Sequence, residues 1–272
     1  MQEFDNVYSK KIVKRYDKHE IQRLSSKRKT ARKRKFGAGR PFKQDIKNRF
    51  LILLVYYRLY ITYTLAGFLF DLDQSNICRD IQKIESLVRQ CLPIPDERLY
   101  KITKKRLRTP DEVEQYFPGF LAFIDSTEQQ IPRPVDKRKR KAYYSGKKKR
   151  HTVKTQMMVN NLGLIVHKTT KKKGCRHDYD IYKKNHPLTP KQVVNVVDLG
   201  YLGIEKDFPA QLSSIPNRKK RNMQQLSDDH KEYNKSHVKK RIVIEHTICR
   251  VKKYRIMSDV FRNKLRKYNK VS

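Results

Sequence analysis

Two aspartates stand at positions where a folded chain would bring their carboxylates together. Asp125 ends the apolar run FLAFID, Asp198 ends the run VVNVVD, and turn-forming residues follow each of them. Active sites of sheets with helical crossovers collect at the carboxyl ends of strands, so neighbouring strands would place these two side chains side by side. A lone aspartate at such a place more often caps a turn, and the pair is therefore the feature that indicates chemistry.

A third acid, Glu245, falls in the last predicted helix. One stripe along this helix begins at Arg241. It continues 4, 8 and 11 residues later with Glu245, Cys249 and Lys252. One interpretation is a helix-stabilising pair of Arg241 and Glu245, worth about 0.2–0.5 kcal/mol. That interpretation leaves unexplained why an acid stands between Ile244 and Ile248, on a face that we expect to turn toward the sheet.

Three carboxylates that converge from two strand ends and a helix would form a site for a hard divalent cation. Mg²⁺ prefers oxygen ligands and is usually held by one or two carboxylates together with phosphate oxygens of a substrate. Two such ions about 3.5–4 Å apart would clamp the attacking and leaving oxygens of a phosphodiester during an in-line displacement. We therefore expect two Mg²⁺ ions at Asp125, Asp198 and Glu245, with Mn²⁺ as a substitute.

The elements that must position these acids have the order of an α/β layer. They are a strand ending at Asp125, a hairpin over 151–170, a helix over 178–185, a strand ending at Asp198, and a final helix from about Ser236 to Tyr254. Between the first strand and the hairpin, residues 133–150 contain ten Lys plus Arg and are expected to form a basic loop. Its lysines Lys147, Lys148 and Lys149 are candidates for contact with a phosphate backbone.

An all-α segment precedes this layer. A helix is expected from Asp45, with helical spacing of Ile46, Phe50, Leu53, Leu54 and Tyr57. A second helical stretch covers about 62–70, and after a short break Ser75 is the expected N-cap of a third helix. The expected buried face of that third helix consists of Ile77, Ile81, Ile84 and Val88.

Two helices joined by so short a break form a helix-turn-helix, in which the second helix enters the major groove of DNA. The outer face of the third predicted helix carries Asn76, Arg79, Asp80 and Lys83. We expect Asn76, Arg79 and Lys83 to contact DNA. The alternative is an ordinary three-helix bundle whose exposed side is merely polar.

The charge of the chain favours a polyanionic partner. It holds 65 Lys plus Arg against 27 Asp plus Glu, a formal net charge of +38. A surface so basic repels itself unless a polyanion neutralises it, which makes nucleic acid the expected partner. The densest block, KRKTARKRK at 27–35, belongs to a basic N-terminal arm, although a solvated tail would have the same composition.

Residues 50–70 have the length of a membrane span but carry Arg58 near their middle and four tyrosines inside. A charge at that depth costs about 2.5–3.5 kcal/mol, so no membrane association is expected. The N-terminal sequence MQEFDNVYSKK has no apolar signal core. We expect a cytoplasmic, nucleoid-associated protein of a prokaryote.

The order of the motifs resembles that of the DDE transposases of bacterial and archaeal insertion sequences, in particular the insertion-sequence-five type. The motifs are FIDST, YYSGKKKRHTVKTQ, KGCRHD, VVDLGYLG and NKSHVKKRIVIEHTICRVKKYRI. The segment from GAGRPF to RDIQKI is similar to the helix-turn-helix that precedes the catalytic domain in that family.

The resemblance implies a ribonuclease H-like fold, a mixed α/β sheet with flanking helices, preceded by an all-α helix-turn-helix domain. The implied domains are a basic arm at 1–44, a helix-turn-helix domain at 45–95, a linker at 96–120 and a catalytic domain at 121–272. It also implies that Asp125, Asp198 and Glu245 bind two divalent ions, nick the ends of an element and join the freed 3′-hydroxyl to target DNA. The expected partner is double-stranded DNA, both terminal repeats and target, bound by a homodimer or larger synaptic complex.

Related transposases carry Tyr, Arg, Glu and Lys around the third acid with two, three and six intervening residues. Arg241, Glu245 and Lys252 match those spacings, whereas Val238 stands at the Tyr position. Lys252 is expected to hold a terminal phosphate, and Arg241 to contact DNA. His177 and Asp178 also match a family motif and are expected to order a loop.

Such proteins usually continue past the last helix with a further partly apolar segment, so the ending RNKLRKYNKVS makes a shortened catalytic domain one expectation. A non-catalytic DNA-binding protein, either a repressor or a decayed transposase fragment, is the alternative function. A ribosomal or RNA-binding protein fits the charge but not three acids at strand and helix positions.

Overall fold

The computed structural model describes residues 12–26, 42–91, 109–185, 189–219 and 225–271. The chain divides into two compact units, Met1–Ile94 and Pro95–Ser272. Each unit is described by itself.

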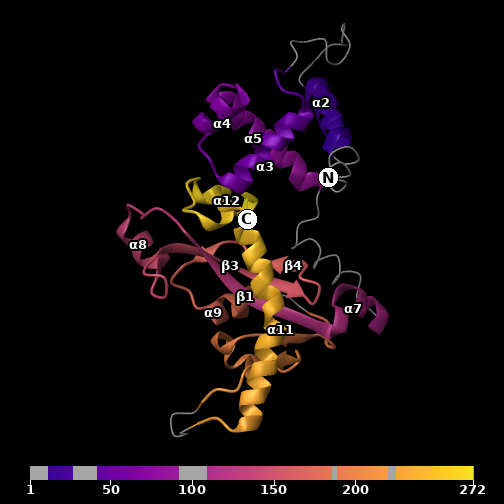
Figure 1. The fold of residues 1–272 in the computed structure, drawn as a ribbon, viewed down its shortest axis with the longest axis vertical. Coiled ribbons are helices and arrows are strands. Elements are labelled where there is room, and N and C mark those ends of the chain that lie inside the picture. The colour runs from indigo at the N-terminus through magenta and orange to yellow at the C-terminus, as the bar shows by residue number, and fades with distance from the viewer. Residues whose placement is uncertain (1–11, 27–41, 92–108, 186–188, 220–224, 272) are drawn as a thin grey trace. The chain divides into compact units, whose positions relative to one another are not determined.

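The first unit is all-α (Figure 1). Its helices are α2 (Lys14–Ser26), α3 (Ile46–Leu59), α4 (Tyr63–Phe70) and α5 (Gln74–Cys91). The carboxylate of Asp45 accepts the backbone N–H of Asn48, and the Thr62 hydroxyl accepts that of Leu65, so α3 and α4 begin at side-chain caps. The helix expected from Asp45 is therefore confirmed.

The turn between α4 and α5 is the helix-turn-helix turn. A Cβ on Gly67 would lie 2.5 Å from the carbonyl oxygen of Leu72, so glycine permits the close approach of this turn to α4. The prediction of Ser75 as N-cap is wrong, because α5 already begins at Gln74. The carboxylate of Asp73 accepts the Ser75 N–H at 2.7 Å and fills that role.

The buried face of α5 contains Ile77, Ile81 and Ile84, as expected, while Leu87 rather than Val88 is its fourth buried residue. The placement of Asp80 on an outer face is wrong. Its carboxylate oxygen lies 2.6 Å from the guanidinium of Arg49, a side chain only 2% exposed. A buried guanidinium needs a paired carboxylate, so Asp80 stabilises the packing of α3 on α5.

Part of the expected basic arm is a helix. The Tyr16 hydroxyl on α2 accepts a hydrogen bond from Arg49 at 2.9 Å, and Glu20 lies 2.6 Å from the ammonium of Lys83. These contacts attach α2 to α3 and α5. The basic block at 27–35 lies outside the described residues.

The second unit is built around a mixed sheet. Its strands are β1 (Leu121–Gln130), β2 (Tyr144–Ser145), β3 (Arg150–Asn160), β4 (Ile165–Lys168), β5 (Lys172–Lys173), β6 (Val194–Val196) and β7 (Ser213–Ser214). The order is β2-β3-β1-β6-β7, with β4 and β5 also pairing with β3. β1, β6 and β7 run parallel and β3 is antiparallel to β1, which confirms the predicted mixed sheet of the ribonuclease H-like class.

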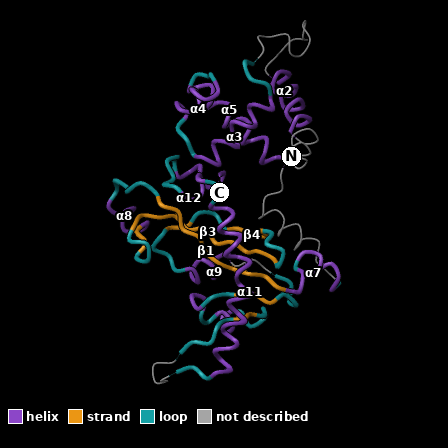
Figure 2. Tube along the Cα trace, viewed as in Figure 1, coloured by secondary structure: helices purple, strands orange, loops and turns teal. Residues whose placement is uncertain are grey.

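Helices of the second unit flank this sheet (Figures 1 and 2). They are α7 (Pro110–Tyr116), α8 (Lys137–Tyr143), α9 (Asp178–Asn185), α10 (Ile204–Asp207), α11 (Asp228–Lys252), α12 (Arg255–Ser258) and α13 (Tyr268–Val271), with 3-10 turns at Pro118–Phe120, Leu199–Tyr201 and Leu265–Lys267. The predictions of a hairpin over 151–170 and a helix over 178–185 are confirmed.

The two faces of the sheet are covered by different helices. On one face, Ile244 of α11 packs on Phe123 and Val196. On the other, Tyr182 of α9 packs with Ile124 in a larger core. Because successive side chains of a strand alternate between faces, Asp125 shares the α11 face with Phe123.

Three boundaries differ from the predictions. The strand predicted to end at Asp125 continues to Gln130, because the residues after Asp125 stay paired with β3, so Asp125 lies within β1. The final helix begins at Asp228 rather than near Ser236, because the Ser227 hydroxyl accepts the His230 N–H and caps a turn of polar residues. The basic segment at 133–150 is not simply a loop, because the carboxylate of Asp136 caps α8 through the Lys139 N–H.

The segment after α11 packs against the sheet. Phe261 and Tyr268 are buried with Ile131 and Val153 in a core of their own. The Phe261 N–H donates to the carbonyl oxygen of Gln130 at 2.8 Å, which attaches this segment to the end of β1.

Residues 50–70 are divided between two helices. Tyr60, between α3 and α4, has a left-handed backbone with φ 48° and separates them. Within the described parts of the chain, no helix has both the length and the apolar character that crossing a membrane requires.

Candidate active site

The register of the sheet brings the two aspartates together. Phe123 pairs with Val196 across the parallel strands β1 and β6, so two residues further along the chain Asp198 stands beside Asp125. Asp198 follows the end of β6 and accepts the Gly200 N–H at 2.9 Å. The Asp198 carboxylate therefore caps a turn, and it also lies at a strand end. Its sequence context allowed either role.

Burial dominates the electrostatics of Asp125. Burial raises the pKa of its carboxyl, and the nearby carboxylates of Asp198 and Asp178 raise it further. The Ser126 N–H, 2.7 Å from Oδ1, and the Arg241 guanidinium, 3.5 Å from Oδ2, lower the pKa in part. The site thus concentrates negative charge that one guanidinium compensates only partly.

Arg241 reaches this site from α11, with its side chain 12% exposed. Glu245 follows one turn later and is exposed. The expectation that its face of α11 turns toward the sheet is therefore wrong, because the neighbouring Ile244 is the residue that packs on the sheet. Across the described ranges, no group of three or more His, Cys, Asp or Glu side chains is close enough to hold a metal ion.

The residues present fit a divalent cation in their chemistry. Asp125 is a partly buried carboxylate, and Asp198 supplies a second hard oxygen donor beside it. Glu245 is on the same helix as Arg241, one turn further along.

Lys252 lies in the last turn of α11 and is surrounded by charges from other segments. Burial lowers the pKa of Lys252, the charge of Lys148 lowers it further, and Asp125 and Glu128 act in the opposite direction. Lys147, Lys148 and Lys149 are exposed in the turn between β2 and β3. The structure therefore brings Lys252 close enough to Asp125, and to Lys148 of a distant segment, for their charges to interact.

A buried ion network behind the site escaped the sequence analysis. The Lys154 ammonium lies 3.4 Å from a carboxylate oxygen of Glu128 and 3.1 Å from one of Asp178, with the Lys154 side chain 9% exposed. The Gln156 amide donates to the carbonyl oxygen of Asp178 at 3.1 Å and to the Tyr201 hydroxyl at 2.8 Å. The KGCRHD motif contains Asp178 and was the available signal.

His237 lies one turn before Arg241 on α11 and is 2% exposed. Its Nε2 is 3.0 Å from the Ser214 carbonyl oxygen, so Nε2 carries the proton and donates. Its Nδ1 and the Nε of Arg241 are both buried with no hydrogen-bond partner among the described residues.

The predicted DNA-reading residues of α5 differ in availability. Asn76 and Arg79 are exposed, and Arg79 donates to the Asn76 side chain at 3.1 Å. Lys83 is paired with Glu20 and lies 4.8 Å from the ring centroid of Tyr16. The first turn of α5 is thus open, whereas Lys83 is held by α2.

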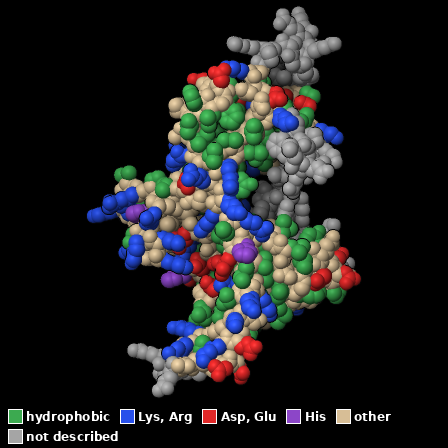
Figure 3. Space-filling view, in the orientation of Figure 1, with side chains coloured by type: hydrophobic (Ala, Val, Ile, Leu, Met, Phe, Trp, Pro, Cys, Tyr) green, Lys and Arg blue, Asp and Glu red, His purple; other side chains and the backbone are tan. Residues whose placement is uncertain are grey.

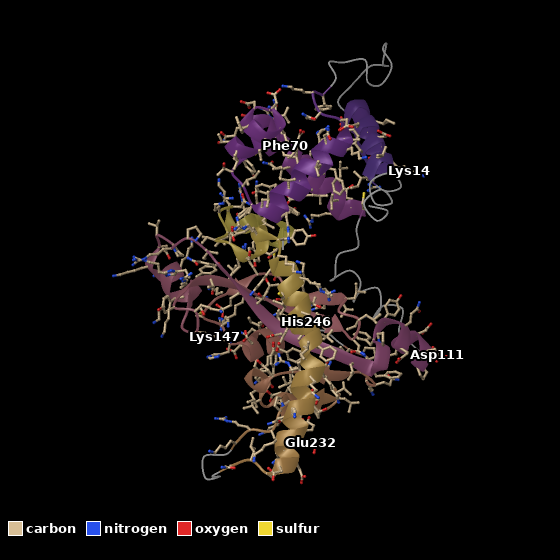
Figure 4. All side chains as sticks on the ribbon, in the orientation of Figure 1. Lys14, Phe70, Asp111, Lys147, Glu232 and His246 are labelled. Atoms are coloured by element: carbon tan, nitrogen blue, oxygen red, sulfur yellow. The ribbon has the colours of Figure 1, made fainter. Side chains whose placement is uncertain are left out.

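The charges of the second unit are unevenly distributed over its surface. In Figure 3, acidic side chains gather beside the middle of α11, with Lys and Arg around them, and further Lys and Arg gather over α8. Figure 4 places His246 at the middle of α11 and Lys147 on the α8 side of it. The acids and the basic turn therefore share one face of the unit.

Two protein families match the chain. One, described as DDE superfamily endonuclease, matches residues 124–272, and the other, described as helix-turn-helix of DDE superfamily endonuclease, matches residues 44–94. The chain is 31% identical over 236 residues to the "Probable transposase for insertion sequence element IS702" of Microchaete diplosiphon, an alignment that covers 87% of this chain and 80% of that protein. No solved structure matches the chain.

Proposed function

The chain belongs to the DDE superfamily of endonucleases and carries that family's helix-turn-helix region before its catalytic region; on this premise we propose that it nicks DNA at the ends of a mobile element and transfers the freed 3′-hydroxyl to target DNA. The observation that carries the proposal is the register of β1 and β6, which sets Asp198 beside Asp125. The proposed catalytic residues are Asp125, Asp198 and Glu245.

The proposed cofactor is Mg²⁺, as two ions, with Mn²⁺ as a substitute. When bound, such cations polarise the scissile phosphodiester and activate the attacking hydroxyl group. Asp125 and Asp198 would hold them, and Glu245 would complete the ligand set from α11. The surroundings of Asp125 support this assignment, because its carboxylate lies near that of Asp198 and two hard oxygen donors are thereby brought together.

The other residues orient the acids and the DNA. Arg241 holds Oδ2 of Asp125 at 3.5 Å and keeps the carboxylate at the strand edge. Lys252 and Lys148 would bind phosphate oxygens next to the acids. Water attacks first and the DNA 3′-hydroxyl second, so no protein nucleophile and no covalent protein intermediate are needed.

The helix-turn-helix would recognise the terminal repeats through Asn76 and Arg79, which lie exposed at the N-terminal part of α5. Two element ends must be cut and joined, so we propose a homodimer or larger assembly on double-stranded DNA. Lys83 would enter this contact only if its pair with Glu20 opened.

The test is strand nicking of a duplex that carries the element's terminal repeats, in Mg²⁺ or Mn²⁺. We expect the wild-type chain to nick it and Asp125→Asn and Glu245→Gln to bind it without nicking. Asp229→Asn, at an exposed carboxylate of the first turn of α11, is the control and should nick normally. Binding without nicking by the wild-type chain would instead favour a non-catalytic DNA-binding protein.

A further inference from the structure

A second basic site lies away from the acids, at α8. A pocket of about 540 Å³ is lined by Arg133, Lys137, Arg140, Lys141, Tyr144 and His151. This volume is within the range of about 300–1,000 Å³ that small ligands occupy in proteins. Four cations and two rings therefore surround a space large enough for a nucleotide unit.

The cations of this pocket come from one face of a helix. Lys137, Arg140 and Lys141 are related by i, i+3 and i+4 spacing on α8, so they project to the same side. Like charges at this spacing destabilise a helix, so their convergence adds nothing to the stability of α8 itself. The convergence of these cations therefore suits the binding of an anion rather than the stability of α8.

Among the residues that the structure describes, no carboxylate forms an ion pair in the pocket. The nearest acid in sequence, Asp136, is engaged as the cap of α8 through the Lys139 N–H at 2.7 Å. The Nε of Arg140 is buried and lacks a hydrogen-bond partner among the same residues. A buried, unpaired guanidinium donor is costly unless a ligand accepts from it.

Tyr144 and His151 give the pocket a ring-lined side. Their ring centroids are 5.7 Å apart in an edge-to-face arrangement, and Tyr144 is 42% exposed. An exposed ring beside cations suits a ligand that joins an anionic group to an apolar ring or sugar face.

We infer that this pocket binds a backbone phosphate of the DNA, with the attached sugar against Tyr144, at a fixed distance from the scissile phosphate. The inference rests on the proposed function, because the scissile phosphate is placed at Asp125. The phosphodiester supplies the anion that the four cations lack, and Arg140 donates to it.

The sheet determines the distance between the pocket and Asp125. Asp125 pairs with Met157 on β3, and His151 lies six residues before Met157 on the same strand and the same face. At about 3.4 Å per strand residue the pocket lies roughly 20 Å from Asp125. The pocket therefore takes a phosphate that lies roughly 20 Å from the scissile one. Lys148 and Lys252 lie along the way, near the acids, and continue the basic path.

The test replaces single phosphates of the element-end duplex by neutral methylphosphonates, position by position, and measures the affinity of the full chain in metal-free buffer. We expect the wild-type affinity to fall by roughly tenfold when the neutral linkage replaces a phosphate that lies roughly 20 Å from the scissile one. Arg140→Ala should weaken binding of the unmodified duplex by a similar factor and should be insensitive to that neutral linkage. Its slope of log affinity against log salt should decrease in magnitude by about one.

Arg138→Ala is the matched control, because Arg138 is exposed on the same helix but does not line the pocket. It removes the same charge and should keep the wild-type response to the neutral linkage. Equal losses for Arg138→Ala and Arg140→Ala, or a neutral-linkage effect that persists in Arg140→Ala, would overturn the inference. Failure of nicking with this binding pattern intact would count against the proposed function alone, because this test measures affinity without metal.

Discussion

Asp125 combines two demands that conflict. Its carboxylate must remain ionised to bind a cation, yet burial and the neighbouring carboxylates of Asp198 and Asp178 raise its pKa. Arg241 and the Ser126 N–H offset this only in part. A buried carboxylate with a raised pKa reduces the stability of the folded chain at neutral pH, so the proposed catalytic role of Asp125 has a measurable cost in stability.

Asp125→Asn should raise the thermal midpoint of the chain at neutral pH in metal-free buffer. The folded-state pKa of Asp125 is above its unfolded value, so the native state binds the proton more tightly and stability increases as pH falls from neutral through the raised pKa. Asparagine removes the charge and therefore this dependence. Differential scanning fluorimetry between pH 7 and pH 4 measures both effects, and a lower midpoint at pH 7 would contradict the explanation.

Divalent cations should stabilise the wild-type chain without any DNA. A ligand that binds only the native state raises the unfolding free energy by RT ln(1 + [L]/Kd), so the thermal midpoint should rise with Mg²⁺ or Mn²⁺ concentration. Asp125→Asn, which lacks a proposed ligand, should show a much smaller shift than Asp229→Asn. Equal shifts in the two variants would place the cation elsewhere.

His237 should make the stability depend on pH below neutrality. Burial lowers its pKa, the charges of Arg241 and Lys240 lower it further, and its contact with the Ser214 carbonyl and the charge of Asp198 act against them. Its folded pKa is below the unfolded value near 6.5, so the unfolded chain binds more protons and stability falls as pH decreases through that value. His237→Gln should flatten the urea midpoint between pH 7 and pH 5.5, and an unchanged slope would refute this role.

At the scale of elements, β1, β3 and α9 are joined by one buried ammonium. Lys154 lies directly opposite Glu128 in the register of β1 and β3, and Asp178 reaches it from the start of α9. Thr152 donates to the other oxygen of Glu128 at 2.7 Å, so that carboxylate is satisfied on both sides. The network fixes α9 to the sheet directly behind the acids.

Lys154→Met should therefore be strongly destabilising, by about 3–5 kcal/mol, because it leaves Glu128 buried with an uncompensated charge. Adding Glu128→Gln should restore part of the loss. Lys183→Met is the control, since its pair with Asp207 is exposed and worth about 0–1 kcal/mol. Urea denaturation gives the three values, and similar losses for the two lysines would show that the network is not the cause.

At the scale of the molecule, the net charge of +38 has opposite effects on the stability of the free chain and on its affinity for DNA. Self-repulsion destabilises the compact chain, while the same charge attracts DNA phosphates. The pocket at α8 and the turn at 147–149 show that part of this charge is concentrated where no ion pair forms among the described residues.

Added NaCl should therefore raise the thermal midpoint of the free chain and weaken its binding to DNA. Salt screens the repulsion between cations over a Debye length of about 10 Å at 0.1 M, which stabilises the free chain. Salt also lowers the entropy gained when counterions are released from DNA, which weakens DNA binding. Fluorimetry and fluorescence anisotropy over one salt series measure the two trends. A midpoint that falls with salt would mean that ion pairs, rather than repulsion, dominate the surface.

Local patterns in the sequence determined much of this protein. Caps such as Asp45 and the apolar spacing around Ile77 are properties of one helix, and the turn at 160–163 belongs to one hairpin, so these elements were predictable. The helix α8 was missed because its run of like charges hides a cap at Asp136. Of the candidate acids, Asp198 was predictable as a strand end followed by a turn, whereas Asp125 lies within β1 rather than at its end. Glu245 was a candidate from its place on the last helix and from the family resemblance.

Only the tertiary structure decided how these residues meet. The register of β1 and β6 sets Asp198 beside Asp125, and the packing of α11 brings Arg241 to the same carboxylate while leaving Glu245 exposed. Such contacts join residues tens of positions apart, and a shift of one residue in strand register would reverse which face each side chain occupies. Burial of Lys154 likewise depends on pairing β3 with β1, so neither its charge nor its position in the sequence could reveal it.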